Sequence, residues 1–169
     1  MPTRYTTMPI CEVPFPEGLG KLEYRGLESD MRHHLGFDFD KSAAHERAFW
    51  GDAYQAILAA HLSVVFDPAG DIIDIAREAI VLARGNEYFQ VDLADESATR
   101  YARAFPPIAR SLTRTEKEIF SWARYPPILV IAKDGSSLIT DGRHRLSYLR
   151  ARIQRADPEF PVLVQLSWE

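Results

Sequence analysis

The chain has a single cysteine, Cys11, among its 169 residues. One cysteine excludes an internal disulfide and any metal site built from cysteines. No stretch reaches the roughly 18 uncharged apolar residues that a membrane-spanning helix requires, so we expect no membrane partner. The N-terminal residues also lack the basic start and apolar run of a secretory signal. We therefore expect a cytoplasmic protein.

Several common catalytic and metal-binding motifs are also missing. The five histidines form neither a His-x-x-x-His nor a His-Glu-x-x-His pattern, so we predict no zinc site. Neither a Walker-type loop nor a Gly-x-Ser-x-Gly elbow occurs. The composition, 46% hydrophobic and 11% aromatic, is nevertheless typical of a chain that buries a real core. An active site therefore has to be recognised outside these motifs.

The net charge of −4 is unevenly distributed along the chain. Residues 1–96 hold 8 Lys/Arg against 17 Asp/Glu, whereas residues 97–169 hold 12 against 7. The basic second part should favour an anionic ligand. A simpler interpretation is that its first four arginines form a solvated helix face; they are Arg100, Arg103, Arg110 and Arg114.

The first part of the chain, residues 1–86, is predicted to be a mainly helical or irregular N-terminal extension. Its beginning is rich in Pro and Gly and holds only short extended pieces, at 5–13 and 21–25. Apolar residues then recur at three- and four-residue steps, which indicates helices. We expect these helices at 42–62 and 68–84.

The second part, residues 87–169, mixes strand and helix signals. The order of elements predicts an α/β (α+β) domain with a mixed sheet. The expected elements are a strand at 87–93, a short helix at 97–105, a helix capped by Thr113 or Thr115 and ending at 124, a hairpin formed by 128–132 and 137–140, a helix at 143–155 and a strand at 160–166.

The most informative segment is the turn Asp141-Gly142-Arg143-His144-Arg145, which leads from a strand into a helix. A helix N-terminus exposes unpaired N–H groups and carries a partial positive charge. Arginines at such a position oppose the helix dipole and lower stability unless a bound anion, or a carboxylate of the protein in a salt bridge, compensates for them. Together with the N–H groups, they predict a site for phosphate.

Each residue of this turn has a functional and a purely structural interpretation. Asp141 is a candidate for orienting the turn, holding Mg²⁺ or acting as a base, but a helix cap would also explain it. Gly142 would permit close approach of a ligand, or only a tight turn. His144 is a candidate phosphate donor or general acid because its pKa lies near neutrality, and it is equally a candidate structural histidine.

The run PPILVIAKDGSSLITDGRHRLSYLRA, followed by FPVLVQL, resembles the ParB/sulfiredoxin superfamily. The similarity extends over about Glu87 to Leu166 and is most specific after Pro127. It implies a ParB/sulfiredoxin-like domain over 87–169 that binds nucleotide phosphates with Gly142, Arg143, His144 and Arg145.

Members of this superfamily perform different chemistry at this turn. Sulfiredoxin uses ATP and needs a cysteine there, which this chain lacks. Partition proteins bind and hydrolyse CTP, and carry a helix-turn-helix reader that we do not find here. Free-serine kinases have the most similar turn, and their catalytic carboxylate lies in the preceding strand-to-helix segment. The resemblance therefore implies a catalytic role for Asp92, Asp95 or Glu96.

The leading hypothesis is an enzyme that uses ATP or CTP with Mg²⁺ for phosphoryl transfer to a small molecule, or that hydrolyses the nucleotide. The alternative is a nucleic-acid-binding regulatory module, or a ParB-like nuclease or toxin-like effector, in which the acidic first part masks the basic surface or mediates a homodimer. The alternative would use the same four arginines together with Arg150, Arg152 and Arg155.

Overall fold

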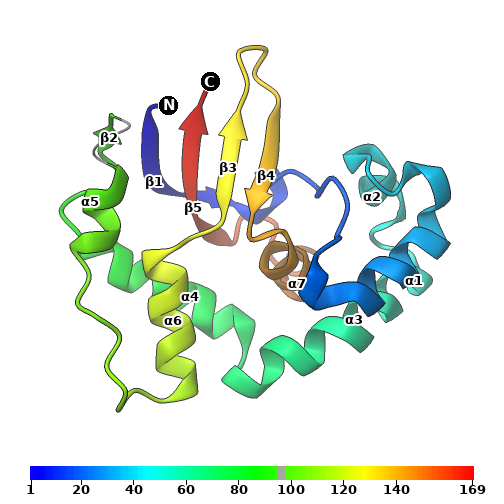
Figure 1. Ribbon diagram of the computed structural model, residues 1–169, viewed down its shortest axis with the longest axis horizontal. Helices are drawn as coiled ribbons and strands as arrows, with labels where there is room; N and C mark the ends of the chain where they lie inside the picture. The colour runs from blue at the N-terminus through cyan, green and yellow to red at the C-terminus, as the bar shows by residue number, and fades with distance from the viewer. Residues whose placement is uncertain (95–97) are drawn as a thin grey trace.

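A five-stranded mixed sheet, in the order β2-β1-β5-β3-β4, organises the chain (Figure 1). The computed structural model describes residues 1–94 and 98–169. β5 is central: it pairs antiparallel with β1 and parallel with β3, so that the two termini lie side by side. The strands are β1 (Thr3–Pro9), β2 (Asp92–Leu93), β3 (Ile128–Ile131), β4 (Ser137–Asp141) and β5 (Pro161–Trp168).

Helices pack around the lower part of this sheet in the view of Figure 1. α4 packs against β5, α6 and α7, and α3 packs against α1 and α7. The predicted mixed α/β class is therefore confirmed. The helices are α1 (Arg25–Leu35), α2 (Ser42–Ala48), α3 (Asp52–Phe66), α4 (Ile72–Arg84), α5 (Ala98–Arg103), α6 (Arg114–Arg124) and α7 (Arg143–Ile153).

The first strand belongs to the same sheet as the strands from the second part of the chain. Seven residues of β1 pair with β5, and the hydroxyl groups of Thr3 and Ser167 lie 3.2 Å apart between the two strands. The predicted extension over 1–86 is largely helical only after β1. Residues 1–86 and 87–169 thus share one sheet, because the chain returns to β1 with its last strand.

Glycines divide the helical segments of the first part more finely than the periodicity predicted. Gly51 is extended and separates α2 from α3, where one continuous helix was expected. Asp67 begins only a short 3₁₀ turn, and Gly70, with φ of 122°, ends it. The cap of α4 is instead Asp71, whose side chain accepts a hydrogen bond from the Ile73 N–H. A periodic apolar face continues across such breaks, so periodicity alone does not reveal them.

Local signals in the second part predicted the helix that precedes the hairpin. Thr113 and Glu116 form a reciprocal capping box at the start of α6. α6 ends at Arg124, because Pro126 cannot continue the helix and Pro127 has no N–H to offer the Ala123 carbonyl. The hydroxyl of Tyr101 donates to that carbonyl instead, at 2.6 Å. α5 is thereby joined to the end of α6.

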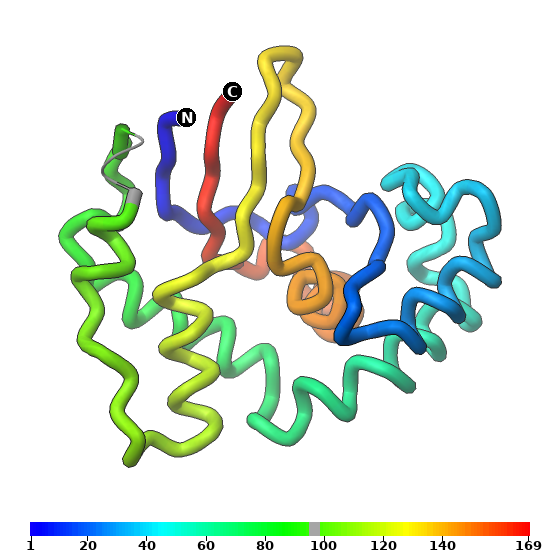
Figure 2. The backbone as a smooth tube through the Cα atoms, viewed as in Figure 1, coloured from blue at the N-terminus to red at the C-terminus, as the bar shows by residue number. Residues whose placement is uncertain are grey.

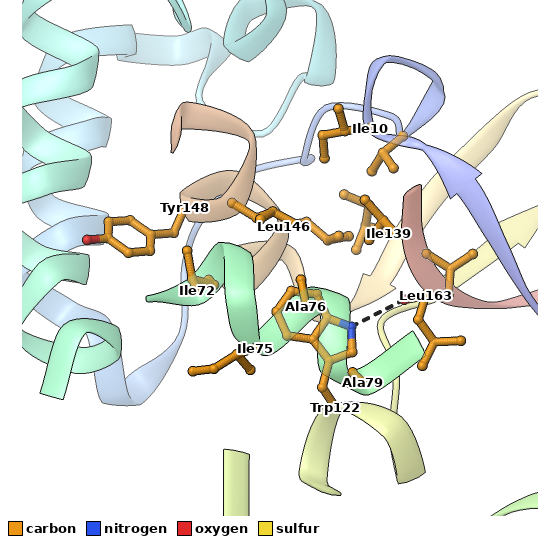
Figure 3. Packing of buried hydrophobic residues seen from close by; sticks show 14 of the residues in the cluster. Ile10, Ile72, Ile75, Ala76, Ala79, Trp122, Ile139, Leu146, Tyr148 and Leu163 are labelled. Carbon is orange, nitrogen blue, oxygen red and sulfur yellow. Dashed lines mark hydrogen bonds between the residues drawn. The ribbon is translucent and has the colours of Figure 1, made fainter. Parts of the chain in front are cut away.

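The core between the helices and the sheet fixes the position of α7 (Figure 3). Trp122 of α6 is buried, and its indole N–H donates to the Leu163 carbonyl of β5 at 3.3 Å. Ala76 and Ala79 of α4 are buried beside it. Leu146 anchors the first turn of α7 in the same cluster. The helix that carries the predicted site is therefore held by the main core.

No single helix in the described ranges is long and apolar enough to cross a membrane. The bent pair formed by 52–69 and α4 meets the length and composition test together, as core helices of soluble proteins also do.

Candidate functional site

The connection between β4 and α7 depends on Gly142. Its φ is 83°, in the left-handed region that favours glycine, and it is the N-cap residue of α7. A Cβ at this position would lie 2.7 Å from Cβ and 2.9 Å from Cα of Pro127. The glycine therefore allows β4 to turn into α7 directly against the strand β3, which Pro127 precedes.

The first turn of α7 has no side-chain cap among the described residues. The first hydrogen bond of the helix runs from the Leu146 N–H to the Gly142 carbonyl. The amides of Arg143, His144 and Arg145 precede it, and N–H groups in this first turn have no partner within the helix. Asp141 lies before the N-cap, so its interpretation as the cap of this helix is wrong.

All five residues of the predicted turn line one cavity of about 560 Å³. A volume of this size suits a small-molecule ligand. The other walls come from distant parts of the chain; they are formed by Gly20, Lys21, Tyr24, Phe66, Glu118, Ser121, Tyr125 and Thr140. The cavity thus joins the start of α7 to the N-terminal segment, the end of α3 and one face of α6.

The two arginines of the turn are held by backbone carbonyls rather than by carboxylates. Arg143 donates to the carbonyl of Glu17 at 3.0 Å. Arg145 donates to the carbonyl of Tyr125 at 3.0 Å, and its guanidinium lies over the Trp122 ring, 5.3 Å from the centroid. Neither arginine forms an ion pair with a carboxylate of residues 1–94 or 98–169. Their charges therefore remain available to an anion.

Two carboxylates in the cavity lie within electrostatic range of Arg145. Burial lowers the pKa of the Arg145 guanidinium, and Asp141 and Glu118 act in the opposite direction. Both acids are exposed. Among the residues that the structure describes, the cavity is therefore lined by three cations, Lys21 and the two arginines, and by two acids that face solvent.

His144 holds the N-terminal segment against α7. Its Nε2 lies 3.0 Å from the Leu19 carbonyl, which can only accept, so Nε2 carries the proton. The ring stacks on Tyr24 with centroids 4.2 Å apart. Burial lowers the pKa of His144, although the hydrogen bond to Leu19 opposes this shift. This geometry indicates that His144 positions the cavity wall with a neutral imidazole.

The predicted catalytic Asp92 lies far from the turn in the sheet. It belongs to β2, at the edge opposite β4, and its carboxylate pairs with Arg4 at 2.7 Å. That ion pair lowers the pKa of Asp92. The expectation that Asp92 joins the site is wrong, because β2 pairs with β1 rather than approaching α7. Asp95 and Glu96 lie outside the described residues.

The cavity residues that the sequence analysis did not single out include Glu118, Lys21 and Tyr24. Glu118 and Ser121 lie on one face of α6, and Tyr125 follows at the same helical spacing. This polar face on a helix that ends just before the hairpin was the available signal. Nothing in the sequence indicated that residues 20–24 would reach the turn.

Two of the arginines proposed for nucleic-acid binding, Arg150 and Arg155, pack against other parts of the protein. Arg150 is 2% exposed and donates to the carbonyls of Val13 and Pro14, with its guanidinium 3.9 Å from the centre of the Phe15 ring. Arg155 lies over the ring of Trp50. The prediction that Arg150 contacts phosphates of a nucleic acid is therefore wrong.

Comparisons with protein-family models, with curated proteins and with solved structures found no match for this chain. Among the described residues, no group of three or more His, Cys, Asp or Glu side chains is arranged to hold a metal ion. The likeness of residues 87–166 to the ParB/sulfiredoxin superfamily thus rests on the sequence pattern alone, and the functional interpretation rests on the cavity.

Gly142→Ala should destabilise the protein by about 2–4 kcal/mol, from the left-handed backbone and the contact with Pro127. Urea denaturation measures this loss. The matched control is Gly135→Ala, because Gly135 has the same φ of 83° but no atom within 4 Å of an added Cβ. It should lose only about 1 kcal/mol, from the backbone conformation. Equal losses in the two variants would contradict the packing explanation.

The unfolding free energy should decrease as the pH falls from 7 to 5. His144 and His45 have pKa values below the ordinary 6.5 in the folded protein, so the unfolded chain binds more protons in this range. Their contribution is complete above the unfolded pKa and is lost as the pH falls towards the folded one.

His144→Gln keeps a donor for Leu19 without titrating, so its stability should depend less steeply on pH. Urea denaturation at several pH values tests this, with folding of both proteins checked at pH 8 by circular dichroism. An unchanged slope would show that protonation of His144 does not oppose folding.

Proposed function

We propose that this protein is an enzyme that binds a nucleoside triphosphate, ATP or CTP, in the cavity at the start of α7 and transfers or hydrolyses its terminal phosphoryl group. The observation that carries the proposal is the convergence of uncapped helix amides with Arg143 and Arg145, neither of which pairs with a carboxylate, in one open cavity. Such a combination of helix N-terminus and guanidinium groups favours phosphate over other small anions.

The two acids of the cavity fit a magnesium ion that arrives with the nucleotide. Mg²⁺ is usually held by one or two carboxylates, with phosphate oxygens and waters completing its shell, rather than by a cage of protein ligands. Asp141, next to the start of α7, is the residue that would hold it. When bound, the ion would neutralise charge that develops on the phosphates.

The remaining groups of the cavity suit the other requirements of phosphoryl transfer. The α7 amides and the two arginines would hold and orient the phosphates, which is the main contribution of a protein to this reaction. Glu118 comes from α6, on a different wall from α7. We assign it the task of orienting the attacking hydroxyl or water and accepting its proton. The sequence resemblance to nucleotide-binding ParB/sulfiredoxin-like proteins supports the same class of ligand.

Arg145→Gln should weaken binding of Mg-ATP or Mg-CTP at least tenfold, equivalent to about 1.4 kcal/mol. The loss follows from removing a guanidinium that is partly desolvated and close to the α7 amides. Isothermal titration calorimetry measures it directly. Arg152→Gln is the control, because Arg152 is exposed, lies on the same helix and does not line the cavity. It removes the same charge and should change affinity less than twofold.

Absence of binding by both nucleotides to the unmodified protein would overturn the proposal. Equal loss of nucleotide affinity in the two variants would instead show that binding depends on the overall positive charge of α7 and not on the cavity.

Glu118→Gln should reduce phosphate release or transfer at least a hundredfold and leave nucleotide affinity within about threefold, as expected for a residue that acts in the reaction rather than in binding. A phosphate-release assay and calorimetry on the same protein separate the two effects. The control is Glu78→Gln, an exposed glutamate of α4 that does not line this cavity. Full turnover by Glu118→Gln would exclude its proposed role.

A further inference from the structure

A second, smaller cavity of about 180 Å³ adjoins the first. Seven of its nine lining residues are apolar or aromatic, and most of these come from α3, α4, α6 and the turn between α3 and α4; they include Val65, Ala69, Ile72, Ile75 and Trp122. Figure 3 shows Ile72, Ile75 and Trp122 around this part of the core. Nothing in the proposed binding of nucleotide phosphates uses these residues.

The two cavities share four lining residues, Tyr24, Phe66, Glu118 and Arg145. Tyr24, Glu118 and Arg145 each combine an apolar or aromatic part with a polar group. Phe66, the fourth, stacks on Tyr148 with ring centroids 5.5 Å apart. Glu118 and Arg145 thus stand at the junction between a polar cavity and an apolar one. A molecule that extends from one cavity to the other would present its hydroxyl or phosphate at this junction.

The apolar cavity arises from the bend between α3 and α4. The segments 52–69 and α4 meet at 52°, because Gly70 breaks the helical path. The bend leaves Val65 and Phe66 on one side and Ile72 and Ile75 on the other. The Asp67 carboxylate accepts a hydrogen bond from the Tyr148 hydroxyl at 2.5 Å and holds the bend against α7. The cavity is therefore part of the folded framework.

We infer that the phosphoryl acceptor is an alcohol with an apolar, aromatic-sized body, which occupies the smaller cavity while its hydroxyl lies beside Glu118. This inference rests on the proposed function and specifies its substrate class. A small polar alcohol such as serine would leave the walls around Val65 and Trp122 unused. A ring or branched chain would bury apolar surface there, between Phe66 and Trp122.

In the reaction that follows, the nucleotide supplies the phosphoryl group that the acceptor receives. The acceptor oxygen forms a bond to the γ-phosphorus of the triphosphate, and the bond from that phosphorus to the β,γ-bridging oxygen breaks. Glu118 takes the hydroxyl proton, and the nucleoside diphosphate leaves. The product is the phosphate ester of this alcohol, whose phosphate lies at α7 and whose apolar body lies in the smaller cavity.

Benzyl phosphate and inorganic phosphate test this inference together by calorimetry. Benzyl phosphate should bind at least tenfold more tightly than inorganic phosphate. Val65→Phe fills the smaller cavity and should remove that advantage, with inorganic phosphate changed less than twofold. Val64→Phe is the matched control, because Val64 is the neighbouring residue, is 70% exposed and lines neither cavity. It should alter neither affinity.

A second variant guards against misfolding of Val65→Phe. Val65→Ala enlarges the cavity and should raise the affinity for 2-naphthylmethyl phosphate relative to benzyl phosphate at least threefold. Equal binding of benzyl and inorganic phosphate, or no effect of either Val65 variant, would overturn the inference and leave phosphate binding intact. Failure of both ligands and of both nucleotides to bind would overturn the proposed function itself.

With Mg-ATP present, transfer of phosphate to 2-phenylethanol should exceed transfer to serine at least tenfold, and Val65→Phe should abolish the difference. Preferential transfer to serine would contradict the assignment of the acceptor, even if nucleotide binding is as proposed.

Discussion

The close approach of Gly142 to Pro127 is the constraint on which the candidate site depends. The left-handed backbone at Gly142 and the absence of a Cβ there let β4 turn into α7 without an intervening loop. A glycine N-cap offers no side chain to the helix amides. The same residue thus sets the direction of α7 and leaves its first turn open. Leu146 anchors that turn in the core. The core therefore fixes the position of the turn relative to the sheet.

Two arginines and a histidine of α7 hold the opposite wall of the cavity in place. Arg150 binds the carbonyl of Val13, Arg143 that of Glu17 and His144 that of Leu19, so residues 13–19 run back along the helix from its end towards its start. Figure 2 shows this N-terminal segment beside α7. Carbonyls satisfy donors without cancelling the charge, as a carboxylate would. The segment is therefore held in place, and it brings Lys21 and Tyr24 to the cavity, while the positive potential of the first turn of α7 is preserved.

The features that the sequence predicted are those with a local physical cause. The Asp-Gly turn, the cap of α6 at Thr113, one of the two threonines expected, and the end of α6 before Pro127 each follow from the conformational preferences of neighbouring residues. The placement of β1 beside β5 is a contact between the two ends of the chain, and no short-range pattern contains it. For the same reason Asp92, which belongs to the expected catalytic segment, lies at the far edge of the sheet. Glu118, which the sequence analysis did not single out, lines the cavity instead.

Charge and shape in the two cavities favour the same type of substrate. The larger cavity carries an excess of positive groups and opens to solvent, which suits a polyanion that arrives with its own cation. Apart from Glu118 and Arg145, the smaller one is lined by apolar and aromatic side chains, so a charged group placed among these side chains would lose hydration without compensation. Glu118 and Arg145 mark the boundary, because they line both. A reaction that joins a phosphate from one side to an apolar alcohol from the other would have its reacting atoms at this boundary.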